Sequence, residues 1–313
     1  MTSMAAGAPA APRKRRWSLA RRRENLYGYL FLTPWLIGFF GLFLGPGLAS
    51  LYLSLSKYDV LTPPQFIGTA NYVKMFTADE QFWSSLWRTA YFAFASVPLS
   101  VLGSMTLAIL LNAKLRGVTV FRTLFFMPSL VPLVASVVLW KWLLNTDFGI
   151  VNQALRSLGV ADPPGWFTEQ AWAIPSLIFL RLWAGIGGTQ MIIFLAGLQG
   201  IPEELYDAAS IDGASSWQKT LRVTIPLLTP TIFFNTVLGV IGALQTFAAA
   251  FVATEGGPGF ATWFYSLHIW KHAFDYWNMG YAAALAWFFA LIIVALTVFQ
   301  MVASKTWVFY YGE

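Results

Sequence analysis

The stretch Pro202-Glu-Glu-Leu-Tyr-Asp-Ala-Ala-Ser-Ile-Asp-Gly-Ala-Ser-Ser-Trp-Gln-Lys-Thr-Leu-Arg-Val-Thr-Ile-Pro226 is polar and able to form helices. Two uncharged runs, 182–202 and 223–254, flank it and overlap its ends. A membrane protein that keeps a folded polar segment between two apolar ones usually presents that segment to a partner on one side of the bilayer. The pattern therefore indicates a helical membrane protein with a docking segment.

The composition of the whole chain supports this interpretation. Of its 313 residues, 57% are hydrophobic and 11% are charged, and the mean hydropathy is +0.60. A soluble domain carries roughly 25% charged residues, so this chain lacks the charge to cover itself in water. A helix needs about 20 apolar residues to cross a bilayer. Further uncharged runs at 25–56, 89–113 and 276–304, and a shorter one at 123–140, meet or approach this length.

We therefore expect an all-α, polytopic membrane protein. A six-helix transmembrane domain over 27–304 follows a basic segment at 1–26, and a tail at 305–313 ends the chain. Excess Lys and Arg mark the cytoplasmic side, and seven of the 20 basic residues precede the first span, so we place the N-terminus inside. Six crossings place the C-terminus inside too. The expected spans are about 28–55, 88–112, 122–144, 171–198, 226–252 and 278–302, with a cytoplasmic loop at 199–225.

Several classes of function are disfavoured by the same sequence. The basic residues lack the aromatic or groove-reading companions of a nucleic-acid surface. The absence of cysteine excludes disulfides, thiolate metal sites and a cysteine nucleophile. The chain also has no phosphate-binding Gly-x-x-x-x-Gly-Lys-Ser/Thr loop and no clustered catalytic residues, so we expect a protein that is not an enzyme and holds no cofactor of its own.

The segment 202–226 predicts two short helices. Pro202 suits a first helical turn, and acidic residues follow it at the positive end of the helix dipole. The first helix should end near Ile211, before Asp212-Gly213, a pair that favours a left-handed turn. Ser215 and Gln218 have the spacing of a capping box for the second helix. Ile225-Pro226 should break that helix where the next span begins.

The charge of this segment favours docking to a partner over lying on lipid headgroups. Four acidic and two basic residues give it a net charge of −2, whereas interfacial helices on anionic membranes are usually basic. On the first helix, Leu205, Ala208, Ala209 and Asp212 lie close to one face.

The segment resembles the signature loop of permease subunits of binding-protein-dependent ABC importers. The usual pattern of that family is Glu-Ala-Ala, three residues, Gly, nine residues and Ile-x-Leu-Pro. This chain has Asp207-Ala208-Ala209, then Gly213, then Val223-Thr224-Ile225-Pro226 at the same spacing. Each replacement preserves charge or shape. In the family, this loop forms the coupling helices that sit in a cleft of the cytoplasmic ATPase.

The resemblance extends along the chain and favours the carbohydrate-uptake branch, of the maltose and glycerol-phosphate type. Several segments are similar to that branch, in the family's order: 66–72, 117–128, 194–202, 254–258 and 307–311. The resemblance implies import of a sugar or oligosaccharide across a bacterial or archaeal cytoplasmic membrane. It also implies four kinds of partner: the bilayer, a second homologous permease, two ATPase subunits that use ATP and Mg²⁺, and an extracytoplasmic sugar-binding protein.

The resemblance and the residue types together suggest site residues. Contacts with the ATPase are expected from Glu203, Glu204, Tyr206, Asp207, Ala208, Ala209, Asp212, Gly213 and Ala214. Gly256, Gly257 and Pro258 are candidates for docking the binding protein. Polar or aromatic residues within the spans are candidates for the substrate path: Arg181, Trp183, Gln190, Asn235 and Gln245.

Some alternatives stay open. Arg181 could face the translocation path, or its side chain could reach outward to the membrane surface. His268 and His272 share a helical face but have no third ligand nearby in the sequence, so we expect no metal site. The solute could be glycerol-phosphate or a peptide instead of a sugar. An ATP-independent secondary carrier is a further alternative, although no Asp or Glu falls inside an expected span.

Overall fold

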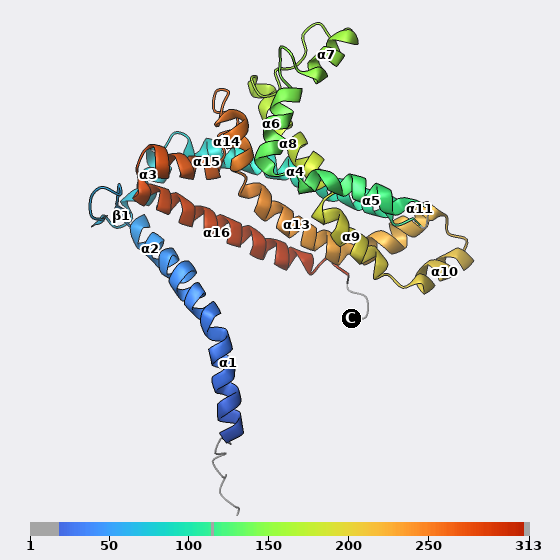
Figure 1. The fold of residues 1–313 in the computed structure, drawn as a ribbon, viewed down its shortest axis with the longest axis horizontal. Coiled ribbons are helices and arrows are strands. Elements are labelled where there is room, and N and C mark those ends of the chain that lie inside the picture. The colour runs from blue at the N-terminus through green and yellow to red at the C-terminus, as the bar shows by residue number, and fades with distance from the viewer. Residues whose placement is uncertain (1–18, 114–115, 310–313) are drawn as a thin grey trace, which may run out of the picture. The chain divides into compact units, whose positions relative to one another are not determined.

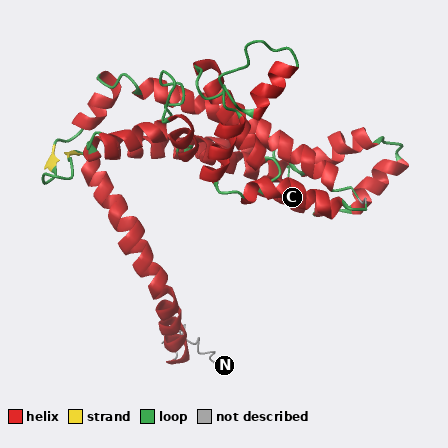
Figure 2. Cartoon of the chain, turned by 45° about the horizontal axis from the view of Figure 1, so that its top comes forward, coloured by secondary structure: helices red, strands yellow, loops and turns green. Residues whose placement is uncertain are grey.

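The computed structural model describes residues 19–113 and 116–309. Most of these residues are helical, and their strands are a short antiparallel pair, β1 (Ser56–Lys57) and β2 (Gln65–Phe66) (Figure 2). The expected all-α fold is confirmed for this part of the chain. The basic cluster at 13–16, Lys114 and the last residues of the tail lie outside the described residues.

The chain divides into two compact units, one ending at Tyr52 and one beginning at Leu53. Three helical elements follow one another without a break, α1 (Leu19–Gly38), the π-helical η1 (Phe39–Leu44) and α2 (Gly45–Ser54), and all but the last two residues of α2 belong to the first unit. The stretch Arg23–Ser54 is long and apolar enough to cross a membrane. Its apolar side chains are exposed around the helix, as expected of a lipid-facing span.

The second unit is a bundle built around α4 (Phe82–Leu111) (Figure 1). This helix packs against α8, α9, α13 and α15. Ser96, Ser100 and Ser104 repeat at intervals of four residues on its buried face. Small residues let helix backbones approach closely in a membrane, where the hydrophobic effect does not drive helices together. The serine stripe therefore explains how α4 can be surrounded by so many helices.

The other elements of this unit follow in chain order. They are α3 (Ala70–Thr77), α5 (Val118–Phe126), η2 (Met127–Leu130), α6 (Leu133–Leu143), α7 (Ile150–Ser157), α8 (Gln170–Gly185), α9 (Thr189–Gln199), α10 (Glu203–Ile211), α11 (Ser216–Lys219), η3 (Thr220–Thr224), α12 (Ile225–Leu227), α13 (Thr229–Leu244), α14 (Ala248–Thr254), α15 (Tyr265–Trp270), η4 (Lys271–Asp275) and α16 (Met279–Ser304). Within this unit, α10 and α11 lie at the opposite end from α3 and α15 (Figure 1).

The expected spans correspond to two kinds of element. Arg23–Ser54, α4 and α16 are continuous helices that could cross a membrane. Three pairs are bent: Val118–Leu130 with α6 by 94°, α8 with α9 by 47°, and Ser216–Leu227 with α13 by 63°. By length and composition, the described residues thus contain three helices that could cross a membrane, or up to six such spans if each bent pair forms one.

The bends were not predicted, because the expected spans were given by their bounds alone. Pro132 precedes α6, and Gly187-Gly188 separates α8 from α9. Proline removes a backbone donor and glycine relaxes steric limits, so both allow sharp changes of direction. The expected span 226–252 is interrupted again at residues 245–247, between α13 and α14.

The predicted break at Ile225-Pro226 is wrong. Residues 216–227 form one helical segment, and the bend comes at Leu228. The π-helical turn η3 comes directly before Ile225 and changes the backbone hydrogen bonding there. Pro226 follows this π-helical turn, within the continuous helical segment.

Candidate functional site

A cavity of about 760 Å³ lies in the second unit, where the bent helices are interrupted. Its wall comes from α4, from the junction of η2 and α6, from the junction of α8 and α9, and from the interruption between α13 and α14. Non-helical backbone at membrane depth is tolerated where it lines a protein cavity. The breaks between these helices therefore lie around the cavity. Its main polar and aromatic wall residues are Phe92, Ser100, Ser129, Ser136, Arg181, Gln190, Gln245, Thr246 and Phe247.

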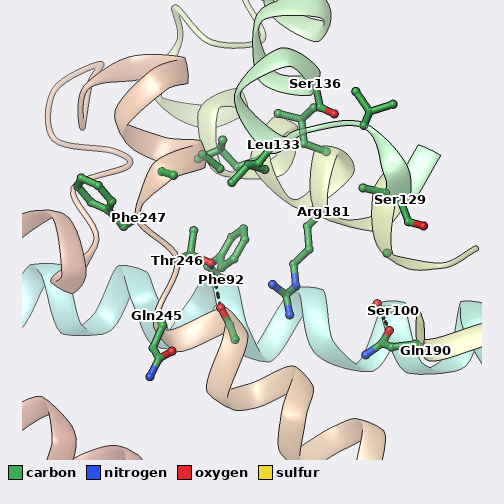
Figure 3. Close-up of a pocket in the computed structure, with 18 residues that line it drawn as sticks. Phe92, Ser100, Ser129, Leu133, Ser136, Arg181, Gln190, Gln245, Thr246 and Phe247 are labelled. Atoms are coloured by element: carbon green, nitrogen blue, oxygen red, sulfur yellow. Dashed lines mark hydrogen bonds between the residues drawn. The ribbon is translucent and has the colours of Figure 1, made fainter. Parts of the chain in front are cut away.

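Three of the five residues predicted for the substrate path, Arg181, Gln190 and Gln245, line this cavity (Figure 3). Arg181 extends from α8, and its Nη2 donates to the carbonyl oxygen of Gly239 on α13 at 3.0 Å. Gln190 accepts hydrogen bonds at Oε1 from Ser100 at 2.6 Å and from Ser104 at 3.3 Å. Of the two alternatives for Arg181, the structure has the side chain within the bundle, against α13.

The other two predicted residues lie elsewhere. Trp183 packs edge-on against Trp140, with ring centroids 5.5 Å apart, and lines a separate apolar groove between α4, α5 and α8. Asn235 is buried in α13, and its Nδ2 donates to the carbonyl oxygen of Thr231 at 3.0 Å. Neither side chain lines the cavity.

Most of the residues that line the cavity were not predicted from the sequence. Ser100 belongs to the four-residue serine repeat of α4, which the sequence displays and which could have pointed to this face. Phe92 lies on the same buried face. Thr246 and Phe247 line the cavity because α13 ends just before them, and no glycine or proline marks that interruption.

The segment 202–226 forms the two helices predicted for it. The first, α10, runs from Glu203 to Ile211, and Gly213 follows with φ +75°, in the left-handed region. The second helix, α11, begins at Ser216, and the side chains of its N-cap residue Ser215 and of Gln218 complete the predicted capping box. These local predictions are confirmed. We call residues 199–225 the coupling loop from here on.

The residues predicted to contact an ATPase are not buried in this structure. Their side chains are exposed or half-buried: Glu203, Glu204, Tyr206, Asp207, Ala208, Ala209, Asp212 and Ala214, with Gly213 at the turn. Two large apolar residues that were not predicted, Ile211 and Trp217, are 88% and 69% exposed. Exposed aromatic and aliphatic side chains at a turn are suited to filling a partner's cleft.

The turn after α14 contains the residues predicted to dock a binding protein. Gly256 has φ +97°, and the Gly257–Pro258 peptide bond is cis. The Thr262 hydroxyl donates to the carbonyl oxygen of Gly257 at 2.9 Å. This hydrogen bond connects Gly257 to the end of the same turn.

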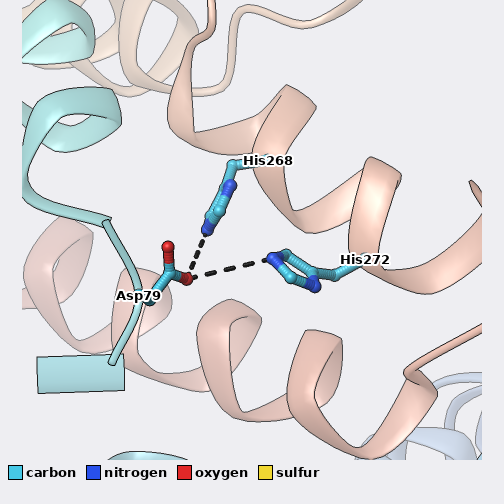
Figure 4. A group of neighbouring side chains, drawn as sticks. All are labelled: Asp79, His268 and His272. Carbon is cyan, nitrogen blue, oxygen red and sulfur yellow. Dashed lines mark hydrogen bonds and ion pairs between the residues drawn. The ribbon is translucent and has the colours of Figure 1, made fainter. Parts of the chain in front are cut away.

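Asp79, which precedes α4, joins His268 and His272 in a cluster (Figure 4). This corrects the expectation that the two histidines have no third group. His268 Nε2 lies 2.8 Å from Asp79 Oδ2, and His272 Nε2 lies 3.9 Å from the same oxygen. The Tyr281 hydroxyl also donates to Asp79, at 2.5 Å. The third group was not visible in the sequence because it lies 189 residues before His268.

A tryptophan decides the protonation of His268. The Trp263 Nε1–H donates to His268 Nδ1 at 3.0 Å, and an indole nitrogen is only a donor. His268 Nδ1 must therefore be unprotonated, so the ring proton lies on Nε2 and is donated to Asp79. This arrangement leaves His268 without a free lone pair for a metal ion. The residues form a hydrogen-bonded chain that links the turn after α14 to α15, α16 and the start of α4.

The pKa values of this cluster follow from burial and hydrogen bonding. Burial alone would raise the pKa of Asp79, but hydrogen bonds from His268 and Tyr281 outweigh it and hold that pKa well below its usual range. Burial lowers the pKa of His272 to about 4. His272 is thus neutral at physiological pH.

Comparison with known proteins identifies the family to which this chain belongs. Residues 75–307 match the family described as "Binding-protein-dependent transport system inner membrane component". The chain is 40% identical over 292 residues to the probable ABC transporter permease protein YesP of Bacillus subtilis, covering 92% of this chain and 94% of that protein.

Two further relatives are named for sugars. The lactose transport system permease protein LacF of Rhizobium radiobacter is 36% identical, over 92% of this chain and 97% of its own length. The trehalose/maltose transport system permease protein MalF of Thermococcus litoralis is 34% identical, over 84% and 87%.

A solved structure has the same fold. A chain of a bacterial alginate ABC transporter, crystallised in complex with a periplasmic protein bound to alginate pentasaccharide, superposes with a TM-score of 0.83 at 23% identity. The match covers 94% of this chain and 98% of that one. The chain described here belongs to the family of binding-protein-dependent transport system inner membrane components.

Proposed function

We propose that this chain is a permease subunit of an ABC importer that carries a sugar or oligosaccharide into the cytoplasm. The observation that carries the sugar assignment is the similarity, along most of the chain, to permeases named for lactose and for trehalose and maltose. The hydroxyl, amide and aromatic groups that line the cavity support it, because such groups can bind sugar hydroxyls and ring faces.

In this proposal the chain crosses the membrane six times, and each bent pair forms one span. We place both termini and the coupling loop on the cytoplasmic side, because basic residues are concentrated before the first span. Within the second unit, α10 and α11 lie at the opposite end from α15. The turn at Gly256, Gly257 and Pro258 then faces outward, where a sugar-binding protein would dock. A second, homologous permease would complete the path.

Two ATPase subunits would supply the energy by using ATP and Mg²⁺. Glu203, Asp207 and the exposed Ile211 and Trp217 would occupy a cleft of the ATPase, so that closure of the ATPase dimer moves the coupling loop. The loop can transmit only the free energy by which the two nucleotide states differ. The bent helices would then open the cavity alternately to each side, with Arg181, Gln190 and Gln245 on the path.

The test is the ATPase activity of the reconstituted assembly with liganded binding protein, for wild type and Gly213→Asp. Gly213 has a positive φ and open space around it, so the substitution adds strain and charge at the turn without a clash. Gly159→Asp is the matched control, because Gly159 also has a positive φ and open space but lies after α7.

We expect Gly213→Asp to assemble with the ATPase and lose stimulation by liganded binding protein, while Gly159→Asp keeps it. Transport of a solute by the purified chain without any ATPase would contradict the proposal and favour a secondary carrier.

A further inference from the structure

Arg181 places a positive charge in the cavity without a counter-ion. Its Nε is buried and has no hydrogen-bond partner, and its only hydrogen bond among the described residues is the one from Nη2 to Gly239. None of the 18 residues that line the cavity is Asp or Glu. Arg181 is also the only charged residue among them.

Packing alone does not require this charge. A charged side chain within a span costs at least ~2.5 kcal/mol on insertion scales, and the cost is highest where no partner neutralises it. The single bond to the Gly239 carbonyl oxygen needs only a neutral N–H donor, which a glutamine could supply. The charge of Arg181 therefore indicates a counter-ion that the transported solute supplies.

The groups around Arg181 indicate what that solute is. Ser100, Ser129, Gln190 and Gln245 offer hydroxyl and amide groups on the same wall, and Ser136 Oγ is a second buried polar atom without a partner. Figure 3 shows the guanidinium of Arg181 extending from α8 into the space between these residues. A planar guanidinium binds carboxylate, sulfonate or phosphate oxygens in pairs, with charge-assisted hydrogen bonds.

We propose that the sugar carried through this permease is anionic and that Arg181 binds its acidic group in the cavity. This inference rests on the proposed function, because it specifies the class of sugar that the same path carries. The serines and glutamines would bind the hydroxyl groups of the solute, and Phe92 and Phe247 would lie against its ring faces.

The test uses disaccharides in matched sets built on glucose, galactose and mannose. Members of a set differ only at C6 of the terminal residue, which is the carbon of a hydroxymethyl group, of a carboxylate or of a phosphorylated hydroxymethyl group. Uptake is measured in vesicles that contain the full assembly and its binding protein. We expect an acidic member to enter at least about tenfold faster than its neutral counterpart, corresponding to one charge-assisted contact. The carboxylate and phosphate members show which anion is preferred.

Variants assign this preference to Arg181. Arg181→Gln should reduce uptake of the acidic member at least about tenfold and bring it to the level of the neutral one. Arg181→Lys keeps the charge and should retain part of the preference. Arg88→Gln is the matched control: Arg88 lies in α4 outside the cavity wall, so its loss should leave the preference unchanged.

The outcomes separate this inference from the proposed function. If a neutral member is imported and its acidic counterparts are not, the sugar function stands and the inference is wrong. An acidic preference that survives in Arg181→Gln would also overturn it. If no member of any set is imported with ATP present, the sugar function fails and the inference fails with it.

Discussion

The hydroxyl oxygens of Tyr206 and Thr224 lie 3.0 Å apart, and this hydrogen bond joins α10 to the end of η3 across the coupling loop. Thr224 is buried, and Tyr206 also packs against the hydrophobic core. The loop is therefore attached to the body of the bundle at Tyr206, while its turn at Gly213 projects outward. A displacement of the turn can therefore be transmitted to η3 and to α13, which follows the bend.

Replacing Tyr206 by phenylalanine tests this attachment. The variant keeps the ring and loses only the hydrogen bond, which contributes about 0.5–1.5 kcal/mol in a typical case. We expect faster amide hydrogen exchange in α10 and a two- to fivefold smaller stimulation of ATPase activity, a size that follows from a loss of about 0.5–1 kcal/mol. Tyr91→Phe is the control because Tyr91 is exposed on α4. Equal exchange in both variants would show that the bond does not hold the loop.

The capping box of α11 gives a second prediction. Ser215 Oγ accepts from the Gln218 N–H at 3.3 Å, and Gln218 Oε1 accepts from the Ser215 N–H at 2.8 Å. Ser215→Ala removes the first of these bonds and should destabilise the start of α11 by about 1 kcal/mol. The neighbouring Ser216→Ala places alanine inside the helix, where it is favourable. Hydrogen exchange of residues 216–219 should therefore accelerate in the first variant and not in the second.

The local parts of this fold could be predicted from sequence because their causes are local. The end of α10 at Ile211 depends on Asp212-Gly213, and the start of α11 depends on Ser215 and Gln218. Each of these signals acts within a few residues. The apolar runs likewise identify helices, since length and composition decide whether a segment can cross a bilayer.

The cavity could not be predicted in the same way. In a membrane helix both the lipid-facing side and the packed side are apolar, so periodicity does not show which face turns inward. Trp183 and Arg181 lie two residues apart on α8, yet Trp183 lies in an apolar groove and Arg181 in the cavity. The partnership of Asp79 with His268 depends on how α15 packs beside the start of α4, and no local pattern contains that information.

The junction between α8 and α9 gives a third prediction. A Cβ atom on Gly187 would lie 1.9 Å from the carbonyl oxygen of Phe125 at the end of α5. Gly187→Ala must therefore push two backbone segments apart, at a cost of about 1–3 kcal/mol or more. Gly185→Ala is the control, because its Cβ would meet Ser100 Oγ at 3.4 Å, an ordinary contact distance. Thermal unfolding in detergent should show a lower midpoint for Gly187→Ala alone. Equal midpoints would contradict the close approach of these backbones.

The last prediction concerns acid stability and His272. The pKa of His272 is about 4 in the folded protein, against an ordinary value of 6.5. Between these values the unfolded chain binds a proton that the folded chain does not, so stability falls as the pH is lowered from about 6.5 towards 4. At pH 5 the loss amounts to on the order of 2 kcal/mol. The carboxyl group of Asp79 affects stability in a lower pH range. Its pKa is lowered in the folded protein, so its contribution to stability is complete above the ordinary pKa of 3.8 and is lost only as the pH falls below that value.

His272→Gln removes the titrating group and keeps a polar side chain of similar size. We expect the thermal midpoint of the wild type in detergent to fall between pH 7 and pH 5, and that of His272→Gln to fall less. Asp79, His268 and Lys74 lie around position 272 in both proteins, so their own titrations contribute to both pH profiles. Subtracting the two pH profiles therefore isolates the titration of His272. If the two profiles are parallel, His272 has the same pKa in the folded and unfolded chain. Burial of the His272 side chain against α16 then does not lower its pKa.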